Sequence, residues 1–163
     1  MSQQNENVVY ERITVEQFRE RAKEDPEYSI DVFTNGISMW PLLRCYEDYV
    51  KIVYPNRELA VGDVILFYRA DGREIAHRIC WLDADNVQTI GDNCDRKDEV
   101  IPRSSVIGLV THTCKKGHLR HIDTPFWIFY GKFMMWSNPV RMFIRNRLYR
   151  PARALARKII KGK

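Results

Sequence analysis

Short apolar runs with strand-like periodicity fill the middle of this chain. Residues 49–54 alternate between apolar and polar side chains, and residues 64–68 are continuously apolar, which are two patterns typical of strands. The turn signal at Asp71-Gly72 predicts that residues 74–82 return as the second strand of a hairpin. The remaining expected elements are strands at residues 30–33, 86–90, 106–111 and 119–122, a polar loop over 91–99, and a turn at 116–117. This spacing predicts a mainly β fold, a small, partly closed antiparallel barrel or folded sheet.

A short helix is predicted before the first strand. Thr14 and Gln17 have the spacing of a capping box, in which each side chain hydrogen-bonds the other residue's backbone N–H. The helix should run over Val15–Glu24 and end before Asp25-Pro26, since a residue that precedes proline disfavours helical backbone. Its faces are mostly charged, so we expect a surface helix that docks through Phe18.

The C-terminal segment has a second helical pattern. An aromatic block occupies residues 126–136, and apolar residues then recur every three or four positions along one stripe: Val140, Ile144, Leu148, Ala152, Leu155 and Ile159. Pro151 is expected to kink or divide this helix. The chain therefore divides into an N-terminal tail with a short helix (1–27), a β domain (28–123) and an amphipathic appendage (124–163).

Charge distinguishes the C-terminal segment from the rest of the chain. The net charge of +5 is the sum of two opposite charges. Residues 1–114 hold 13 Lys/Arg and 20 Asp/Glu and are therefore acidic, whereas residues 115–163 hold 13 Lys/Arg and the single acid Asp123 and are strongly basic. Such basic segments typically contact anionic lipid or nucleic acid. The apolar stripe and the aromatic block favour a helix lying in an anionic membrane surface, with a packed, solvated appendage as the alternative. No nucleic-acid-binding motif accompanies them, so nucleic acid is the weakest of the three interpretations.

Composition also bears on cofactors and location. The 45% content of hydrophobic residues argues against disorder, and the four cysteines, which have no CxxC spacing, indicate reduced thiols rather than a metal site or a disulfide framework. No run of about 18–20 apolar residues is present, and residues 1–7 lack the hydrophobic region of a secretory signal. We expect a cytoplasmic protein, with the inner face of the membrane as a second location, and no cofactor.

Two short segments hold a candidate nucleophile and a candidate base. Ser38 lies in the segment Gly-Ile-Ser-Met-Trp-Pro (residues 36–41), where a glycine-containing turn can present a serine beside backbone N–H groups that stabilise an oxyanion. His77 follows 39 residues later in the predicted strand 74–82, and a neutral imidazole can accept the serine proton. Alternation places Ile75, His77 and Ile79 on one side of that strand. Taken singly, each segment fits a turn serine or a packed histidine better than a catalytic residue.

Two further segments fall in order around these two. They are Val-Gly-Asp-Val-Ile-Leu-Phe (residues 61–67) and Gly-Asp-Asn-Cys-Asp-Arg-Lys-Asp (residues 91–98). The four segments together resemble the signal-peptidase superfamily, specifically its serine–histidine branch, over residues 34–111. The resemblance implies a mostly antiparallel, partly closed β-structure with its active site on the surface.

The resemblance also implies roles for particular residues. Ser38 would be the nucleophile and His77 the base, while Gly36 and Met39 would border the oxyanion site and the substrate cleft. An aspartate should orient the histidine. The family spacing selects Asp98, and Asp92, which lies in the better-matched part of its segment, is the alternative.

The sequence departs from the family pattern in two respects. Many bacterial relatives carry a serine two residues before the nucleophile, where this chain has Gly36, so backbone N–H groups, that of Ser38 first, would stabilise the oxyanion. Typical members carry a transmembrane helix before the serine motif, and this sequence has none. The branch that uses lysine as its base is disfavoured, since no lysine lies between Lys51 and Lys97.

These observations predict a serine endopeptidase that cleaves a leader or signal segment from a precursor peptide or protein. A role in peptide maturation follows from analogy with the superfamily. Two alternatives stay open: a non-catalytic module that binds a membrane surface, and a regulator that cleaves itself. The serine, histidine and aspartate positions argue against the first alternative. The missing lysine base and the absence of a helix-turn-helix segment argue against the second.

Overall fold

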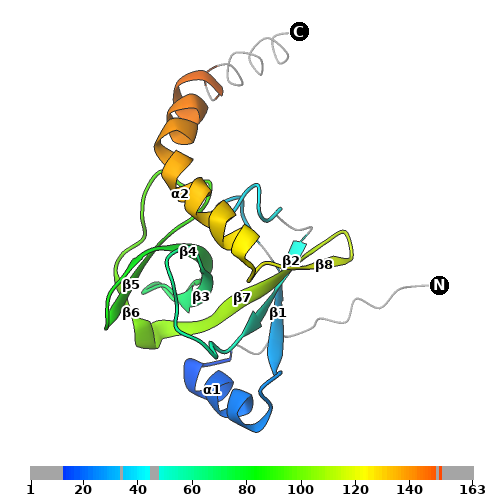
Figure 1. Ribbon diagram of the computed structural model, residues 1–163. Coiled ribbons are helices and arrows are strands. Elements are labelled where there is room, and N and C mark those ends of the chain that lie inside the picture. Colours follow the sequence, from blue (N-terminus) through cyan, green and yellow to red (C-terminus); the bar gives the residue numbers. More distant parts are fainter. Residues whose placement is uncertain (1–12, 34, 45–47, 150, 152–163) are drawn as a thin grey trace, which may run out of the picture.

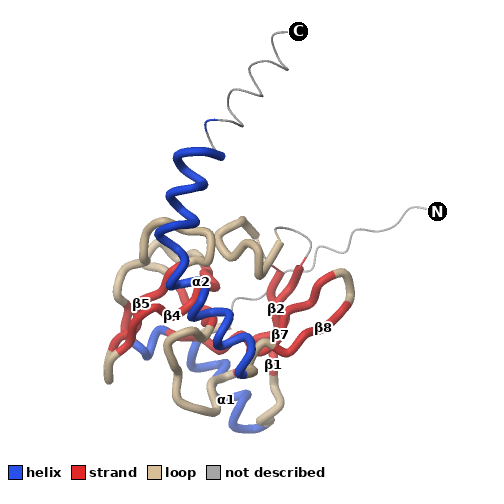
Figure 2. Tube along the Cα trace, turned by 45° about the horizontal axis from the view of Figure 1, so that its top comes forward, coloured by secondary structure: helices blue, strands red, loops and turns tan. Residues whose placement is uncertain are grey.

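A curled antiparallel sheet forms the body of the protein and confirms the predicted mainly β fold (Figure 1). The computed structural model describes residues 13–33, 35–44, 48–149 and 151. A short helix lies at one end of this half-barrel, and a long helix rises from the other end (Figures 1 and 2). The described elements are α1 (Val15–Glu24), β1 (Ser29–Phe33), β2 (Asp48–Val53), β3 (Val64–Tyr68), β4 (Glu74–Leu82), β5 (Asn86–Ile90), β6 (Ile101–Pro102), η1 (Arg103–Ser105), β7 (Val106–Lys115), β8 (His118–His121), α2 (Pro125–Ile144) and η2 (Arg145–Tyr149).

The order of strands in the sheet is β1-β2-β7-β3-β4-β5-β6, and β8 pairs with β7. All of the pairings are antiparallel. The long strand β7 holds the sheet together, because it pairs with β2, β3 and β8. The first strand, β1, therefore lies at one edge of the sheet.

Local sequence signals account for much of this structure. The Thr14 side chain accepts from the Gln17 N–H and the Gln17 side chain accepts from the Thr14 N–H, so α1 begins with the predicted capping box and has the predicted bounds. Phe18 of α1 is fully buried, as predicted. The strands β3, β4 and β5 also have the predicted bounds.

Tertiary pairing moved the bounds of other strands. β7 continues past the predicted residue 111 to Lys115, because β2 and β8 both pair with its second half. The neighbouring β8 starts one position earlier than residues 119–122 predict. The short β6 and the η1 turn were not predicted, since two strand residues carry no periodicity.

The sheet buries apolar side chains on both of its faces. Within β3, Val64 and Leu66 belong to one core cluster, whereas Ile65 and Phe67 belong to another. Alternation of side chains across a strand produces this division. A strand buried on both faces reads as a continuous apolar run, which explains the sequence of residues 64–68.

The C-terminal helix differs from the expectation. The aromatic block and the start of the predicted stripe belong to one helix, α2, which contains Pro139 and passes into the π-helical turn η2. The residues that surround Pro151, and the predicted stripe residues Ala152, Leu155 and Ile159, lie outside the described part of the chain. Among the described residues, no helix has the length and the apolar character needed to cross a bilayer.

Candidate active site

Ser38 lies in the connection between β1 and β2, held there by the loop that follows β5. The Asn93 backbone N–H donates to the Ser38 carbonyl oxygen at 2.7 Å, and the Asn93 side-chain amide donates to the Ile37 carbonyl oxygen at 3.0 Å. Gly36 has a φ of +101°, a left-handed conformation that glycine adopts without steric cost. Two of the four segments that carried the family resemblance, 36–41 and 91–98, are therefore in direct contact.

Met39 turns inward from the same segment. Its side chain is buried in the larger core cluster, and its sulfur accepts a weak hydrogen bond from the Asp92 backbone N–H at 3.5 Å. Burial of the residue that follows Ser38 anchors the turn, while Ser38 itself stays partly exposed. The hydrophobic neighbour thus orients the serine segment on the sheet.

His77 lies on β4, and its imidazole ring is hydrogen-bonded to the carboxylate of Asp98. Its partner across the hairpin is Ile65, and Ile75 and Ile79 on the same strand contact the second core cluster, as the predicted alternation requires. The His77 Nδ1 atom lies 2.6 Å from Asp98 Oδ2. His77 is 6% exposed, so this hydrogen bond is largely protected from water.

Asp98 is held by three side chains at once. Besides His77, the Thr89 hydroxyl donates to Oδ2 at 2.7 Å, and the Arg69 guanidinium donates to Oδ1 at 2.5 Å. Burial opposes ionisation of this carboxyl, but the hydrogen bonds from His77, Thr89 and Arg69 outweigh it and lower the pKa of Asp98 below its ordinary value. An ionised Asp98 accepts a hydrogen bond from Nδ1–H, which leaves the lone pair of the neutral imidazole on Nε2.

The other ring nitrogen of His77 lies near the Ser38 segment. A Cβ added to Gly91 would stand 2.8 Å from the Ser38 carbonyl oxygen and 3.0 Å from His77 Nε2. Both atoms therefore approach the same point, and only glycine leaves room for them. Nδ1 engages Asp98 and Nε2 faces the serine turn, which is the orientation that a histidine base needs.

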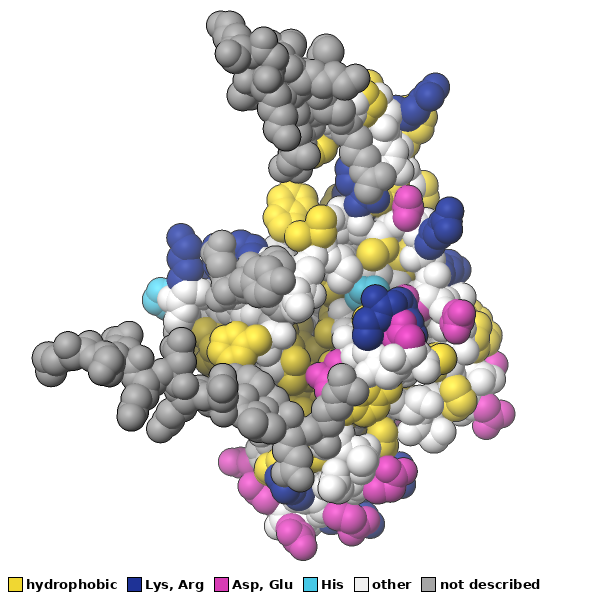
Figure 3. Space-filling model, turned by 180° about the vertical axis from the view of Figure 1, so that it is seen from behind, with side chains coloured by type: hydrophobic (Ala, Val, Ile, Leu, Met, Phe, Trp, Pro, Cys, Tyr) yellow, Lys and Arg dark blue, Asp and Glu magenta, His cyan; other side chains and the backbone are white. Residues whose placement is uncertain are grey.

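A groove of about 200 Å³ opens beside these groups. Its lining is mostly apolar: Val32, Phe33, Asn35, Gly36, Ser38, Met39, Leu43, Val50, Leu66, Glu74, Ile75, Ala76 and His77. Seen from behind in Figure 3, hydrophobic side chains (yellow) line a hollow near the centre of the molecule. Ser38, His77, Gly36 and Met39, all predicted site residues, border one cavity.

Asp92, the alternative aspartate, has a different partner. Arg78 binds both of its carboxylate oxygens, each at 2.8 Å, and the two side chains are 3% and 1% exposed. Arg78 also donates to the Gly62 carbonyl oxygen and lies over the Tyr130 ring. The structure therefore brings Asp98 to His77 and places Asp92 in a closed, buried ion pair that joins the sheet to α2.

A thiol also approaches the serine turn. The Cys94 sulfur lies 2.7 Å from the position of the added Gly91 Cβ. Burial, with the charge of Asp98 next in size, raises the pKa of the Cys94 thiol, and so the nucleophilic thiolate is disfavoured. Ser38 borders the groove and Cys94 is not among its lining residues, which favours Ser38 as the nucleophile.

The helix α2 braces the loop that holds Ser38. Arg141 donates to the Asp92 carbonyl oxygen at 2.8 Å, and the Asn138 side chain donates to the Cys94 carbonyl oxygen at 2.9 Å. Arg145 donates to both the backbone oxygen and the side-chain oxygen of Asn93. The helix, the loop after β5 and the serine turn thus form one connected set of hydrogen bonds.

Several residues of this site were missed by the sequence analysis. Arg69, just after β3, and Thr89, in β5, bind Asp98, and neither residue belongs to a recognised motif. Arg145 binds Asn93 and comes from a segment that was interpreted only as a basic tail. Asn93 was part of a matched segment, but its contacts with residues 37 and 38 depend on the path of the loop. No sequence signal specifies these partners, because each contact depends on the path that the chain takes between the two residues.

Comparison of the chain with protein-family models, curated proteins and solved structures gives no match. Within the described ranges, no group of three or more His, Cys, Asp or Glu side chains could hold a metal ion. The proposal that follows therefore starts from the arrangement of Ser38, His77 and Asp98 and the groove beside them.

Proposed function

We propose that this protein is a serine endopeptidase that cleaves a leader or signal segment from a precursor peptide or protein. The observation that carries the proposal is the orientation of His77, with Nδ1 on Asp98 and Nε2 toward the serine turn beside an apolar groove. The resemblance of residues 34–111 to the serine–histidine branch of the signal-peptidase superfamily supports the same reaction.

In the proposed reaction, the Ser38 hydroxyl attacks the carbonyl carbon of the scissile peptide bond. His77 Nε2 takes the hydroxyl proton, and ionised Asp98 stabilises the imidazolium that forms. The Ser38 backbone N–H would stabilise the negative oxygen of the tetrahedral intermediate. His77 then gives its proton to the leaving amine, and water attacks the acyl-enzyme with His77 again acting as the base.

The groove suggests how a substrate would bind. The strand β1 lies at the sheet edge, and Val32 and Phe33 at its end border the groove. An extended peptide can pair with an exposed strand edge and place alternate side chains in a pocket. A groove of about 200 Å³ with an apolar lining favours small apolar residues next to the cleaved bond.

The test compares protein N-termini, by mass spectrometry, in host cells that express either the wild-type chain or its Ser38→Ala variant. We expect a set of N-termini that is present with the wild type and absent with Ser38→Ala. Two controls should keep this set: Ser104→Ala, which removes an exposed hydroxyl elsewhere, and Cys94→Ala, which removes the neighbouring thiol.

Two outcomes would contradict the proposal. Identical N-termini with folded wild type and Ser38→Ala would remove the case for a peptidase. Loss of the same N-termini in Cys94→Ala, but not in Ser38→Ala, would assign the nucleophile to the thiol.

A further inference from the structure

One side of α2 exposes large apolar side chains along its whole length. The members of this exposed stripe recur every three or four residues: Phe126, Phe129, Phe133, Trp136, Val140 and Phe143. Their exposed fractions range from 48% for Phe133 to 79% for Trp136. Twenty helical residues span about 30 Å, so the exposed stripe is a long, continuous apolar surface.

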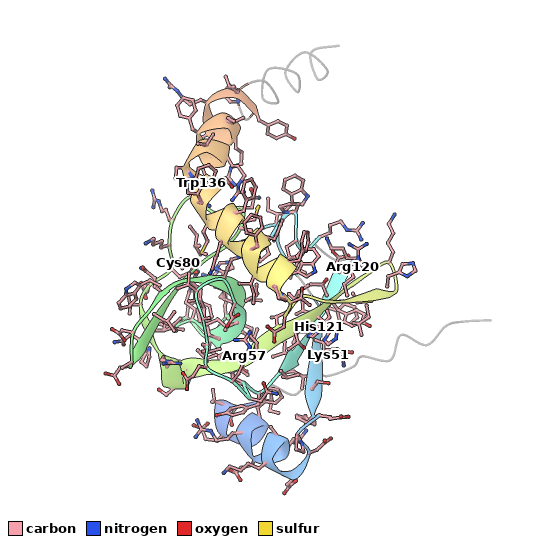
Figure 4. All side chains as sticks on the ribbon, viewed as in Figure 1. Lys51, Arg57, Cys80, Arg120, His121 and Trp136 are labelled. Carbon is pink, nitrogen blue, oxygen red and sulfur yellow. The ribbon has the colours of Figure 1, made fainter. Side chains whose placement is uncertain are left out.

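The other side of the same helix is already occupied. Gly131, Met134, Asn138 and Met142 are buried, and Asn138 and Arg141 donate to the loop after β5. A Cβ on Gly131 would meet the Arg78 guanidinium at 2.5 Å, so this side lies tight against the body. The contacts hold α2 in one orientation, and the exposed stripe faces outward. Figure 4 shows Trp136 on the half of α2 that rises away from the sheet.

The charge around the exposed stripe favours one class of partner. Residues 115–163 hold 13 Lys/Arg against the single acid Asp123, and no acid follows it. Lys132 lies three residues after Phe129 and four before Trp136, which places an exposed cation beside the stripe. In Figure 3, hydrophobic (yellow) and basic (dark blue) side chains lie side by side on the projecting helix.

These features fit an anionic bilayer better than a second copy of the chain. Two copies joined through the exposed stripe would bring two strongly basic segments together, and their repulsion would oppose the contact. An anionic surface attracts the same segments, at about 1 kcal/mol for each Lys or Arg near it. Phe and Trp side chains are also favoured at the boundary between lipid headgroups and acyl chains.

We infer that the exposed stripe of α2 seats the protein on an anionic membrane surface, with the helix lying in the interface. The turn η2, which continues α2, reaches the serine turn through two consecutive contacts, from Arg145 to Asn93 and from Asn93 to the Ile37 carbonyl oxygen. Ile37 and Trp40, on either side of Ser38, are exposed at 66% and 56%. The two contacts come from the side of the helix opposite the exposed stripe, so the serine turn is held to the helix while the stripe stays free to enter the interface.

The experiment is flotation of the full chain with vesicles of phosphatidylcholine alone or of phosphatidylcholine with 30% phosphatidylglycerol. We expect binding to the anionic vesicles that weakens in high salt, and much weaker binding to neutral ones. The double variant Phe133→Ser/Trp136→Ser should weaken binding to anionic vesicles about a hundredfold, since it removes two large apolar side chains from the interface. The matched control is Trp81→Ser, which removes an exposed tryptophan from β4 and should change binding less than about twofold.

The outcomes separate this inference from the proposed function and from dimerisation. The Ser38→Ala chain should bind vesicles as the wild type does, so loss of peptidase activity leaves the inference standing. Equal binding by the folded double variant and the wild type would overturn it, as would no binding to anionic vesicles. A dimer found by analytical ultracentrifugation without lipid, and lost in the double variant, would instead assign the exposed stripe to a second copy.

Discussion

His77 and Arg78 are neighbours on β4, yet they belong to different kinds of site. Each side chain binds an aspartate from the loop after β5: His77 binds Asp98, and Arg78 binds Asp92. The Arg78–Asp92 pair is almost completely buried, and both of its carboxylate oxygens are bound by the guanidinium. The His77–Asp98 pair borders a groove, and its imidazole keeps a second nitrogen toward Ser38.

The difference shows what separates a structural ion pair from a candidate catalytic pair. In the Arg78–Asp92 pair, both carboxylate oxygens and the guanidinium are engaged within the protein. In the His77–Asp98 pair, Asp98 is fully engaged, whereas the second ring nitrogen of His77 lies beside the serine turn and the groove. Three substitutions test this comparison, starting with the largest expected effect.

Asp98→Asn should lower the cleavage rate about 10⁴-fold, because an amide stabilises the wrong tautomer of the histidine and no longer balances the imidazolium. The measurement is the rate of formation of the N-terminus that disappears with Ser38→Ala. Asn at this position can keep its oxygen toward Arg69, and the Thr89 hydroxyl can then accept from its amide, so the variant should fold. A variant with the wild-type rate would separate Asp98 from the reaction.

The same variant gives a test of the lowered pKa of Asp98. Because the folded pKa lies below the ordinary value of about 4, ionised Asp98 stabilises the fold above that pH and loses this effect as the pH falls through the folded pKa. Asparagine does not titrate. The stability advantage of the wild type over Asp98→Asn, measured by urea unfolding, should therefore shrink as the pH falls below about 4.

Asp92→Asn should act on stability instead. It leaves the buried Arg78 charge without its counter-ion, and breaking such a pair from one side costs about 3–5 kcal/mol in the free energy of unfolding. Urea unfolding at neutral pH measures the loss. The double variant Arg78→Met/Asp92→Leu, which removes both charges, should recover much of it. A stable Asp92→Asn with greatly reduced cleavage would reverse the assignment of the two aspartates.

Asn93→Ala should have the smallest of the three effects. It removes the hydrogen bond from the side chain to the Ile37 carbonyl oxygen and the acceptor for Arg145, but keeps the backbone bond to Ser38. A slightly displaced serine should lower kcat about tenfold to a hundredfold with KM unchanged, because the groove lining is intact. A rise in KM with kcat unchanged would show that Asn93 acts on substrate binding rather than on Ser38.

Local sequence signals predicted the elements whose cause is itself local. The capping box at Thr14 and Gln17 predicted the start of α1, Asp25-Pro26 predicted its end, and the Asp71-Gly72 turn predicted the hairpin of β3 and β4. Local signals did not predict the full length of β7, because its second half forms a strand through its pairing with β2 and β8.

The sequence placed Ser38 and His77 among the candidates but left two aspartates open. Asp92 and Asp98 lie in the same polar loop, six positions apart, and nothing local distinguishes them. The path of the loop decides between them: Asp98 returns to β5 by donating its N–H to the Thr89 carbonyl oxygen, which carries its side chain to the His77 side of β4.

The helix α2 gives the clearest division between sequence and tertiary structure. Its sequence determined that residues 125–144 are apolar, aromatic and accompanied almost only by basic charge. Apolar residues lie on both sides of this helix, so periodicity could not tell which side would be buried. The tertiary structure decides which side is buried, through hydrogen bonds from Asn138, Arg141 and Arg145 to the loop after β5. These polar groups turn their side of the helix toward the body, because their partners lie in that loop. The phenylalanines and Trp136 are therefore left exposed on the other side.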